Sequence, residues 1–270
     1  MRGIKFINGI VKDAEITSII TKRDIASKHK GSKLGQLWSV INPIIMLMVY
    51  TIVFSAVFKA RWSTEINSEG STLIYGMNLF CGLTVYNIFS EVAGRATTLV
   101  TSNPNYVKKI KFPLHSLGEM ATYSALYQGA SNTSILLAMV LIVNKGIPVT
   151  IILLPIIWGP LVLNCLGISW ILSTIGVYAK DITQVVNAGL SALMFMTPIF
   201  YPIESLPNKL QWVATINPIA TTIANTRQIA LAGEVPDFLG LLVEYIGAVL
   251  WCEITYRILI RKQREFADLL

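Results

Sequence analysis

An uncharged run of 25 residues, Leu34 to Phe58, constrains the fold more than any other feature. A helix needs about 20 apolar residues to cross the hydrocarbon core of a bilayer, so this run is long enough to span a membrane. The stretch before it, residues 22–33, carries five basic residues and one acid. Lysines and arginines mark the cytoplasmic flank of a span. The sequence therefore predicts a cytoplasmic N-terminus, and this first crossing sets the sidedness of the rest.

The composition is typical of an integral membrane protein with one domain. The chain has 270 residues, of which 53% are hydrophobic and 14% are charged, whereas a soluble domain has about 25% charged residues. A net charge of +7 could suit nucleic acid. However, sixteen of the 22 lysines and arginines fall on segments predicted to be cytoplasmic, which is an orientation signal. No nucleic-acid partner is expected, and the N-terminus lacks the apolar core of a cleaved signal peptide.

The predicted fold class is an all-α integral membrane protein with six transmembrane helices and both termini in the cytoplasm. The transmembrane domain covers residues 35–260, with spans at about 35–58, 71–100, 114–143, 148–174, 182–202 and 238–260. Residues 1–34 form a cytoplasmic segment, and residues 261–270 form a cytoplasmic tail. Within the first segment, residues 10–26 predict an amphipathic helix on the inner membrane surface. A helix packed against a cytoplasmic partner would suit the same pattern.

Residues 203–233 are half apolar but are interrupted by Pro207, Pro218 and Gly233. They are too broken for a full crossing and predict re-entrant helices that dip in from the outside. Such backbone is tolerated in a membrane only where protein or water covers it, so this gate region is expected to flank an aqueous path. Its candidate gate residues are Asn217, Pro218 and Arg227.

Two pairs of opposite charges lie within predicted spans at a spacing of four residues, Glu91 with Arg95 and Glu253 with Arg257. This spacing places both members on one helix face, where they can pair. Because a charge in a membrane is costly unless it is paired or faces water or protein, both pairs are predicted to be intramembrane ion pairs. A direct role in transport is the alternative.

Motifs for independent chemistry are missing from the sequence. There is no GxxxxGK[ST], GxSxG, HExxH or GxGxxG motif, and two histidines with three scattered cysteines do not suggest a metal or nucleophile site. The sequence predicts no catalytic residue and no bound metal. Uphill transport would need a coupling ion at buried carboxylates or a partner that hydrolyses nucleotide.

Three stretches resemble the type 2 ABC exporter permeases, in particular the subgroup that exports O antigen, capsule and teichoic acid. They are residues 22–58, the inner loop NPNYVKKIKFPLHSL at 103–117, and residues 178–233 with the motifs KDI, TPIFYP and NP. One departure is Lys28-His29-Lys30, where relatives often have Arg-Tyr-Arg. The basic character is kept, so only local contacts are in doubt.

The resemblance implies a homodimer in the bacterial inner membrane with one translocation canal between the two copies. It implies that this chain is not an enzyme and binds no cofactor, while two cytoplasmic ABC ATPase subunits hold ATP and magnesium. The implied substrate is an undecaprenyl-linked O-antigen polysaccharide whose lipid enters from the inner leaflet. The inner loop resembles the coupling helix that docks on the ATPase, and its candidate residues are Asn103, Pro104, Asn105, Tyr106, Val107, Lys108 and Lys109. The basic residues there could equally reflect orientation bias alone or contact lipid phosphate.

A sugar polymer needs flat apolar surfaces for its C–H faces and polar groups for its hydroxyls. The candidate canal-lining aromatic residues are Tyr50, Phe54, Phe58, Phe195, Phe200 and Tyr201. Helix packing or a lipid-facing aromatic belt would also explain them.

Other functions remain open on the residues alone. A capsule or teichoic acid exporter, or a permease of the same fold for a small molecule or drug, fits the same topology. An ion-coupled carrier would use Glu91, Glu119, Glu244 and Glu253. A membrane enzyme acting on lipid-linked sugar is the last alternative.

Overall fold

A computed structural model of the chain describes residues 4–28, 30, 34–53, 70–107, 112–205, 211–212 and 216–269. All regular structure within these ranges is helical. The helices are α1 (Lys5–Lys12), α2 (Ala14–Lys28), α3 (Trp38–Ile52), α4 (Gly70–Ala96), α5 (Pro104–Val107), α6 (His115–Asn144), α7 (Leu154–Tyr178), α8 (Ile182–Met196), α10 (Pro218–Arg227), α11 (Phe238–Lys262) and α12 (Phe266–Leu269). Short 3-10 segments occupy Gly35–Leu37, Val149–Leu153 and Ile203–Ser205, and a π-helical turn covers Gln228–Ala232.

Four helices are long and apolar enough to cross a membrane: α4, α6, α7 with its preceding 3-10 turn, and α11. The helices α3 and α8 are apolar but have 15 residues each, which corresponds to about 22 Å against a hydrocarbon core of about 30 Å. The all-helical membrane architecture is therefore confirmed. The six-crossing topology stays a prediction, because part of the first predicted span, residues 54–58, lies outside the described residues.

The helix α8 ends six residues before the predicted end of its span at residue 202. It stops at Met196, and Thr197 adopts an extended conformation with φ −87° and ψ 137°. The cause is Pro198, since a residue that precedes proline is disfavoured in helical geometry. The chain then turns back toward α10.

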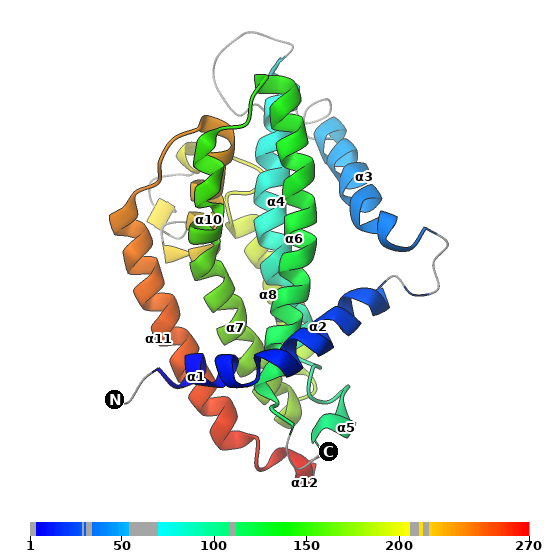
Figure 1. Cartoon of the computed structure of the whole chain (residues 1–270). Coiled ribbons are helices and arrows are strands. Elements are labelled where there is room, and N and C mark those ends of the chain that lie inside the picture. Colours follow the sequence, from blue (N-terminus) through cyan, green and yellow to red (C-terminus); the bar gives the residue numbers. More distant parts are fainter. Residues whose placement is uncertain are drawn as a thin grey trace.

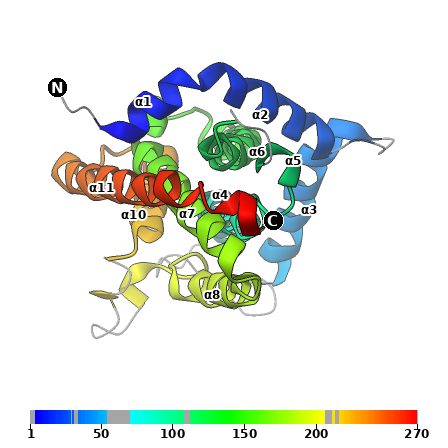
Figure 2. The same cartoon turned by 90° about the horizontal axis from the view of Figure 1, so that it is seen from below.

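The helix α4 forms the centre of the bundle. It packs against α6, α7, α10, α3 and α8, and Figure 2 shows it enclosed by these helices while α2 crosses one side of the bundle. Of its most apolar 18-residue window, 72% is buried, compared with 22% for α11. The core is therefore built around α4, and α11 lies at the periphery.

The peripheral helix α11 is held against α7 by large side chains that lie over glycines. The Tyr245 ring packs on Gly159 and the Trp251 ring packs on Gly167, so closely that a Cβ atom added to either glycine would overlap the ring. The Tyr245 hydroxyl also donates a hydrogen bond of 2.6 Å to the Ile156 carbonyl oxygen. Small residues at such contacts let membrane helices approach closely.

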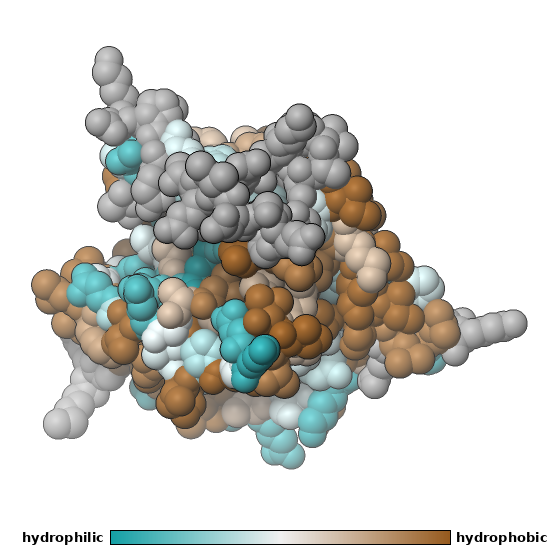
Figure 3. All heavy atoms as spheres, turned by 90° about the horizontal axis from the view of Figure 1, so that it is seen from above, coloured by the Kyte–Doolittle hydropathy of each residue, from teal (hydrophilic) through white to brown (hydrophobic). Residues whose placement is uncertain are grey.

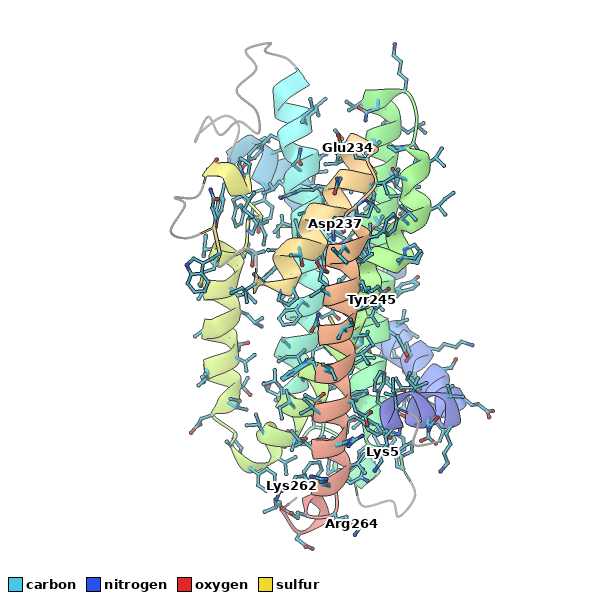
Figure 4. The ribbon with its side chains drawn as sticks, turned by 90° about the vertical axis from the view of Figure 1, so that its left-hand side faces the viewer. Lys5, Glu234, Asp237, Tyr245, Lys262 and Arg264 are labelled. Carbon is cyan, nitrogen blue, oxygen red and sulfur yellow. The ribbon has the colours of Figure 1, made fainter. Side chains whose placement is uncertain are left out.

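The short helices α1, α2, α5 and α12 gather at one end of the bundle (Figure 1). Figure 4 shows Lys262, Arg264 and Lys5 near this end, while Glu234 and Asp237 lie at the opposite end of α11. Asp237 begins α11 by accepting hydrogen bonds from the backbone N–H groups of Leu239 and Gly240. Basic residues concentrate on the cytoplasmic side of membrane proteins. This placement agrees with cytoplasmic termini, whose sidedness stays a prediction.

Exposed apolar side chains cover the outer faces of α3 and α11. Figure 3 shows a mainly hydrophobic flank on the side where α3 lies in Figure 1. The exposed residues include Ile45, Met48, Val49 and Ile52 on α3 and Leu239, Leu242, Val243 and Ile246 on α11. Apolar surface of this extent requires cover by lipid or another subunit.

The N-terminal segment differs in detail from the predicted amphipathic helix over residues 10–26. It forms two helices, and the face of α2 that is buried consists of Thr17, Ile20 and Thr21. Ile19, an apolar residue within this predicted helix, is exposed. The marked amphipathic pattern lies on α1, where Phe6 is buried. The physical reason is that α2 turns the Thr17 hydroxyl toward α6, where it donates a hydrogen bond of 2.7 Å to Glu119.

Candidate functional site

A groove with a volume of about 660 Å³ runs between α3, α4, α6 and α8. Its wall combines aromatic rings, amides and apolar side chains: Trp38, Ser39, Asn42, Pro43, Met46, Leu47, Tyr50, Phe80, Leu83, Thr84, Asn87, Ser90, Glu91, Gln128, Asn132 and Met194. The groove is open along its length, and no single polar cluster dominates it. Such a surface is suited to an extended ligand with both apolar faces and hydroxyl groups.

Two of the groove's amides hold its walls together. The Gln128 amide donates hydrogen bonds of 2.9 Å to the Ser39 carbonyl oxygen and 3.1 Å to Asn132 Oδ1, which joins α6 to α3. By contrast, Thr84 Oγ1 is buried and has no hydrogen-bond partner among the described residues. Since a buried hydroxyl without a partner is costly, this side chain is a candidate contact for a polar ligand.

The predicted canal-lining aromatic residues divide into separate groups. Tyr50 lines the groove, whereas Phe54 and Phe58 lie outside the described residues. Phe195 and Phe200 stack with their ring centroids 5.9 Å apart near the end of α8, and the Tyr201 hydroxyl donates to the Phe195 carbonyl oxygen at 2.8 Å. These three residues are not part of the groove wall, and their role in a canal stays a prediction.

Glu91 and Arg95 lie 3.5 Å apart, as their spacing predicts, but each has a shorter contact with α2. The Arg95 guanidinium donates to both carboxylate oxygens of Asp24, at 2.7 and 3.1 Å. Lys28 Nζ lies 2.5 Å from Glu91. The predicted pair is thus half of a four-residue network that fastens α2 to α4 beside one end of the groove. Sequence spacing along a single helix could not find the partners on α2.

The network keeps Asp24 ionised at neutral pH. Burial of its carboxyl group opposes ionisation, but the hydrogen bonds and charge of Arg95, together with the charge of Lys28, outweigh burial and hold the pKa of Asp24 below its usual value. A lowered pKa in the folded state adds stability at pH values above the unfolded-state pKa, and this contribution is lost as the pH falls through the folded-state pKa. The Asp24–Arg95 contact therefore persists throughout the physiological range.

The second predicted pair also forms and also reaches the N-terminal segment. Arg257 lies 2.6 Å from Glu253 on α11, and the second Glu253 oxygen accepts a 3.1 Å hydrogen bond from the Phe6 backbone N–H of α1.

A third polar cluster, centred on His115, was not predicted. His115 Nδ1 lies 2.7 Å from Glu119, and Nε2 lies 3.0 Å from Asp13 at the bend between α1 and α2. The four-residue spacing of His115 and Glu119 along α6 indicates that these two side chains can meet. The sequence does not indicate the third member of the cluster, Asp13, because it is 102 residues from His115.

The predicted gate residues connect α10 to the centre of the bundle. Asn217 begins α10 by accepting from the Ile219 N–H at 3.0 Å, and its amide donates to Thr197 Oγ1 at 2.9 Å. Pro218 occupies the first turn of α10. The Arg227 guanidinium donates to the carbonyl oxygens of Asn78, Pro198 and Ile199 at 2.8–3.1 Å. This side chain therefore joins α10 to α4 and to the turn after α8.

The predicted coupling loop contains the short helix α5 at the end of the bundle that also carries α1 and α12 (Figure 1). Asn103 donates to the Leu99 carbonyl oxygen at 2.9 Å, and Tyr106 stacks on Phe112 with centroids 4.3 Å apart. Pro104 begins α5, Val107 ends it, and Asn105 is exposed. Lys108 and Lys109 lie outside the described residues.

The described residues contain no group of three or more His, Cys, Asp or Glu side chains that could hold a metal ion. Cys81, Cys165 and Cys252 are free and buried.

Comparison with known proteins places these features in a family. The sequence pattern of the ABC-2 type transporter family matches residues 16–231. The O-antigen export system permease protein RfbA of Klebsiella pneumoniae is 25% identical over 257 residues, which cover 90% of this chain and 93% of that protein. A protein of the same name from Myxococcus xanthus is 20% identical over 251 residues, covering 92% and 93%.

The polysialic acid transport protein KpsM of Escherichia coli is 23% identical over 232 residues, covering 83% of this chain and 84% of that protein. The matched region is a membrane permease domain, which lacks an ATPase. Because the family pattern extends over most of the sequence, the chain belongs to the ABC-2 type transporter family.

Proposed function

We propose that this chain is the permease subunit of an ATP-driven exporter that moves lipid-linked polysaccharide, with O antigen as its substrate, across the bacterial inner membrane. The observation that carries the proposal is the open groove lined by aromatic rings and amides in a member of the ABC-2 family. The relatives named for O-antigen export and for polysialic acid transport support polysaccharide as the cargo. A capsular polysaccharide is the second candidate cargo, since one relative is named for the transport of polysialic acid, which is also a polysaccharide.

The chemistry of the groove suits a glycan. Trp38 and Tyr50 offer flat faces for the C–H surfaces of sugar rings, and the amides offer donors and acceptors for hydroxyl groups. In a homodimer with six crossings per copy, the groove of each copy would face a shared canal between the exposed surfaces of α3 and α8. Among the described residues of the wall, Glu91 is the only charged one, and a mainly uncharged surface suits a polymer that must slide along it.

An external motor fits the chain better than ion coupling. Three of the four acids that a carrier would need already have partners: Glu91 is paired with Lys28 and Arg95, Glu253 with Arg257, and Glu119 with His115. In the proposed complex two ABC ATPase subunits, which hold ATP and magnesium, would contact the end of the bundle that carries α1, α2 and α5.

The function is tested by co-purification and reconstitution. The chain should purify with an ATPase encoded by a neighbouring gene, and proteoliposomes that contain both should move lipid-linked polysaccharide only when ATP is supplied. Movement by the purified chain alone would contradict the proposal. So would transport that stops when the proton gradient is collapsed while ATP stays high, which would indicate an ion-coupled carrier.

The groove itself is tested with Thr84→Val. Valine has the shape of threonine without the hydroxyl, and Thr84 has no described hydrogen-bond partner to lose. We expect stability equal to or above that of the wild type, because a buried hydroxyl without a partner is removed, but export slowed about fivefold, which corresponds to a hydrogen bond of about 1 kcal/mol. Asn87→Leu, which removes an exposed amide from the groove wall, should act similarly. Asn144→Leu, at the far end of α6 outside the groove, is the control, and equal export in all variants would exclude a role for the groove.

The coupling loop is tested by reversing its charges. We predict that Lys108→Glu combined with Lys109→Glu leaves ATP hydrolysis active but separates it from export, because a basic loop that docks on the ATPase would then repel it. The readout is the amount of polysaccharide exported per ATP hydrolysed. Reversal of Lys145 in the predicted external turn is the matched control. Unchanged export per ATP in the double variant would count against docking.

A further inference from the structure

The His115 side chain is enclosed between two carboxylates that come from different parts of the chain. Its Nδ1 lies 2.7 Å from Glu119 Oε1, and its Nε2 lies 3.0 Å from Asp13 Oδ2. The side chains of His115 and Glu119 are 4% and 0% exposed, and that of Asp13 is 19% exposed. Both ring nitrogens thus lie within hydrogen-bond distance of a carboxylate oxygen, and the Glu119 carboxylate is fully buried.

Hydrogen counting shows that this arrangement requires an extra proton. A neutral imidazole has one N–H group, and an ionised carboxylate can only accept. Two N···O hydrogen bonds therefore need a second hydrogen, carried either by an imidazolium or by a protonated carboxyl group. The Thr17 hydroxyl cannot supply it, because it donates to the other Glu119 oxygen at 2.7 Å. The cluster accordingly holds one proton beyond those of a neutral histidine and two carboxylates.

The surroundings fix the cluster in place. The Trp170 indole N–H of α7 donates to the His115 carbonyl oxygen at 3.0 Å, and the His115 ring lies 5.4 Å from the Tyr256 ring of α11. Gly9 of α1 lies against the Tyr256 hydroxyl so closely that an added Cβ atom would overlap it. Four helices and the bend at Asp13 therefore meet here.

Most of the other titratable groups facing the cluster are acidic or phenolic. The Tyr256 phenol interacts electrostatically with the carboxylates of Glu119, Asp13 and Glu253. The Tyr123 phenol of α6 interacts electrostatically with the Glu119 carboxylate. Two cations lie nearby: Arg257, which is paired with Glu253, and Lys22 of α2, which lines a pocket together with Glu119 and Tyr123.

We propose that this shared proton makes the Asp13–His115–Glu119 cluster a strap that holds the N-terminal helices against the membrane helices, and that His115 is a positioning residue for coupling. With the proton, both contacts of His115 are hydrogen bonds. When the shared proton is lost as the pH rises, one of the two contacts pairs a carboxylate oxygen with an unprotonated ring nitrogen. Since both atoms are acceptors, that hydrogen bond is lost, and the bend between α1 and α2 is released. The link is therefore present at low pH and weakened at high pH.

The strap matters because α2 leads into α3, which forms one wall of the groove. Movement of α2 relative to α6 would shift this wall. This consequence for export rests on the proposed function, whereas the strap itself does not.

The test measures amide hydrogen exchange of residues 5–28 in the full chain in lipid nanodiscs, expressed as protection factors between about pH 5 and pH 9. Protection should fall by about tenfold as the pH rises, through local opening of the N-terminal helices. In Glu119→Gln the side-chain amide N–H supplies the second hydrogen, and this hydrogen does not titrate. Protection in this variant should therefore change by less than about twofold between the lowest and the highest pH. Asp13→Asn should behave in the same way, for the same reason.

His115→Phe should lose protection at every pH in residues 5–28, while α4 and α7 keep theirs, which shows that the fold is intact. Glu15→Gln, an exposed acid on α2, is the control and should keep the wild-type pH dependence. Wild-type protection that does not change with pH would overturn the proposal, and so would a pH dependence that persists in both Glu119→Gln and Asp13→Asn. Because the measurement needs neither ATP nor polysaccharide, its failure is distinct from failure of the proposed function.

Discussion

Replacing Arg227 by methionine is expected to lower the free energy of unfolding by about 3–5 kcal/mol, since a hydrogen bond from a charged donor contributes about 1.5–3 kcal/mol and its loss leaves buried acceptors unpaired. The guanidinium donates to three carbonyl oxygens, those of Asn78, Pro198 and Ile199. Gly82 makes room for this arrangement, because a Cβ there would lie 2.8 Å from Arg227 Nη2. Arg227→Lys keeps the charge but lacks the planar fork, so an intermediate loss is expected.

The measurement is unfolding by SDS titration of the chain in mixed micelles. Arg261→Met, at the exposed end of α11, removes the same charge and should change stability by no more than about 0.5 kcal/mol. Gly82→Ala should reproduce part of the loss by displacing the guanidinium. If Arg227→Met unfolded at the wild-type SDS concentration, Arg227 would not be what joins α10 to α4.

Gly176→Ala is expected to destabilise the protein by about 2–4 kcal/mol, because overpacking a rigid contact forces the backbone to shift. An added Cβ would overlap the Thr97 carbonyl oxygen and lie 2.9 Å from the carbonyl carbon. Both atoms belong to the backbone of the turn after α4, so no side-chain rotation can relieve the contact. The ends of α4 and α7 that meet at this turn would have to separate.

The same substitution at Gly189 gives the opposite expectation. Outside its own turn of helix, no atom of the described residues lies within 4 Å of a Cβ placed there, and alanine is favoured over glycine in a helix by about 0.5–1 kcal/mol. Gly189→Ala should therefore stabilise α8 slightly in the same SDS titration. Equal effects at the two positions would show that helix propensity, rather than the close approach of α7 to Thr97, governs Gly176.

Features that depend on neighbouring residues could be predicted. The long apolar runs predicted α4, α6, α7 and α11, since hydrophobicity summed along a segment decides whether it can enter a bilayer. The Asn217-Pro218 pair, interpreted from sequence as an interruption, also carries a local signal for the start of α10, because an asparagine cap is followed by proline. The end of α8 also has a local signal, because Pro198 disfavours helical geometry at Thr197. The apolar residues that follow Pro198 led to the prediction of a longer span.

The partners of the charged residues could not be predicted. Spacing along one helix correctly brought Glu91 to Arg95 and Glu253 to Arg257, but it left out Asp24, Lys28 and the Phe6 N–H. His115 had no assigned role until Asp13 was found beside it. These contacts join segments that lie up to 247 residues apart, and nothing local distinguishes the right partner from the other charges.

The sequence by itself determined the membrane character, the helices and the uneven distribution of positive charge, because each of these properties belongs to a continuous stretch of chain. Only the tertiary structure decided how α1 and α2 are fastened to the bundle, how Arg227 holds α10 to α4, and which faces of α3, α4, α6 and α8 form the groove. The physical reason is that a polar group in an apolar surrounding must find a partner in three dimensions, and the packing of the helices selects that partner.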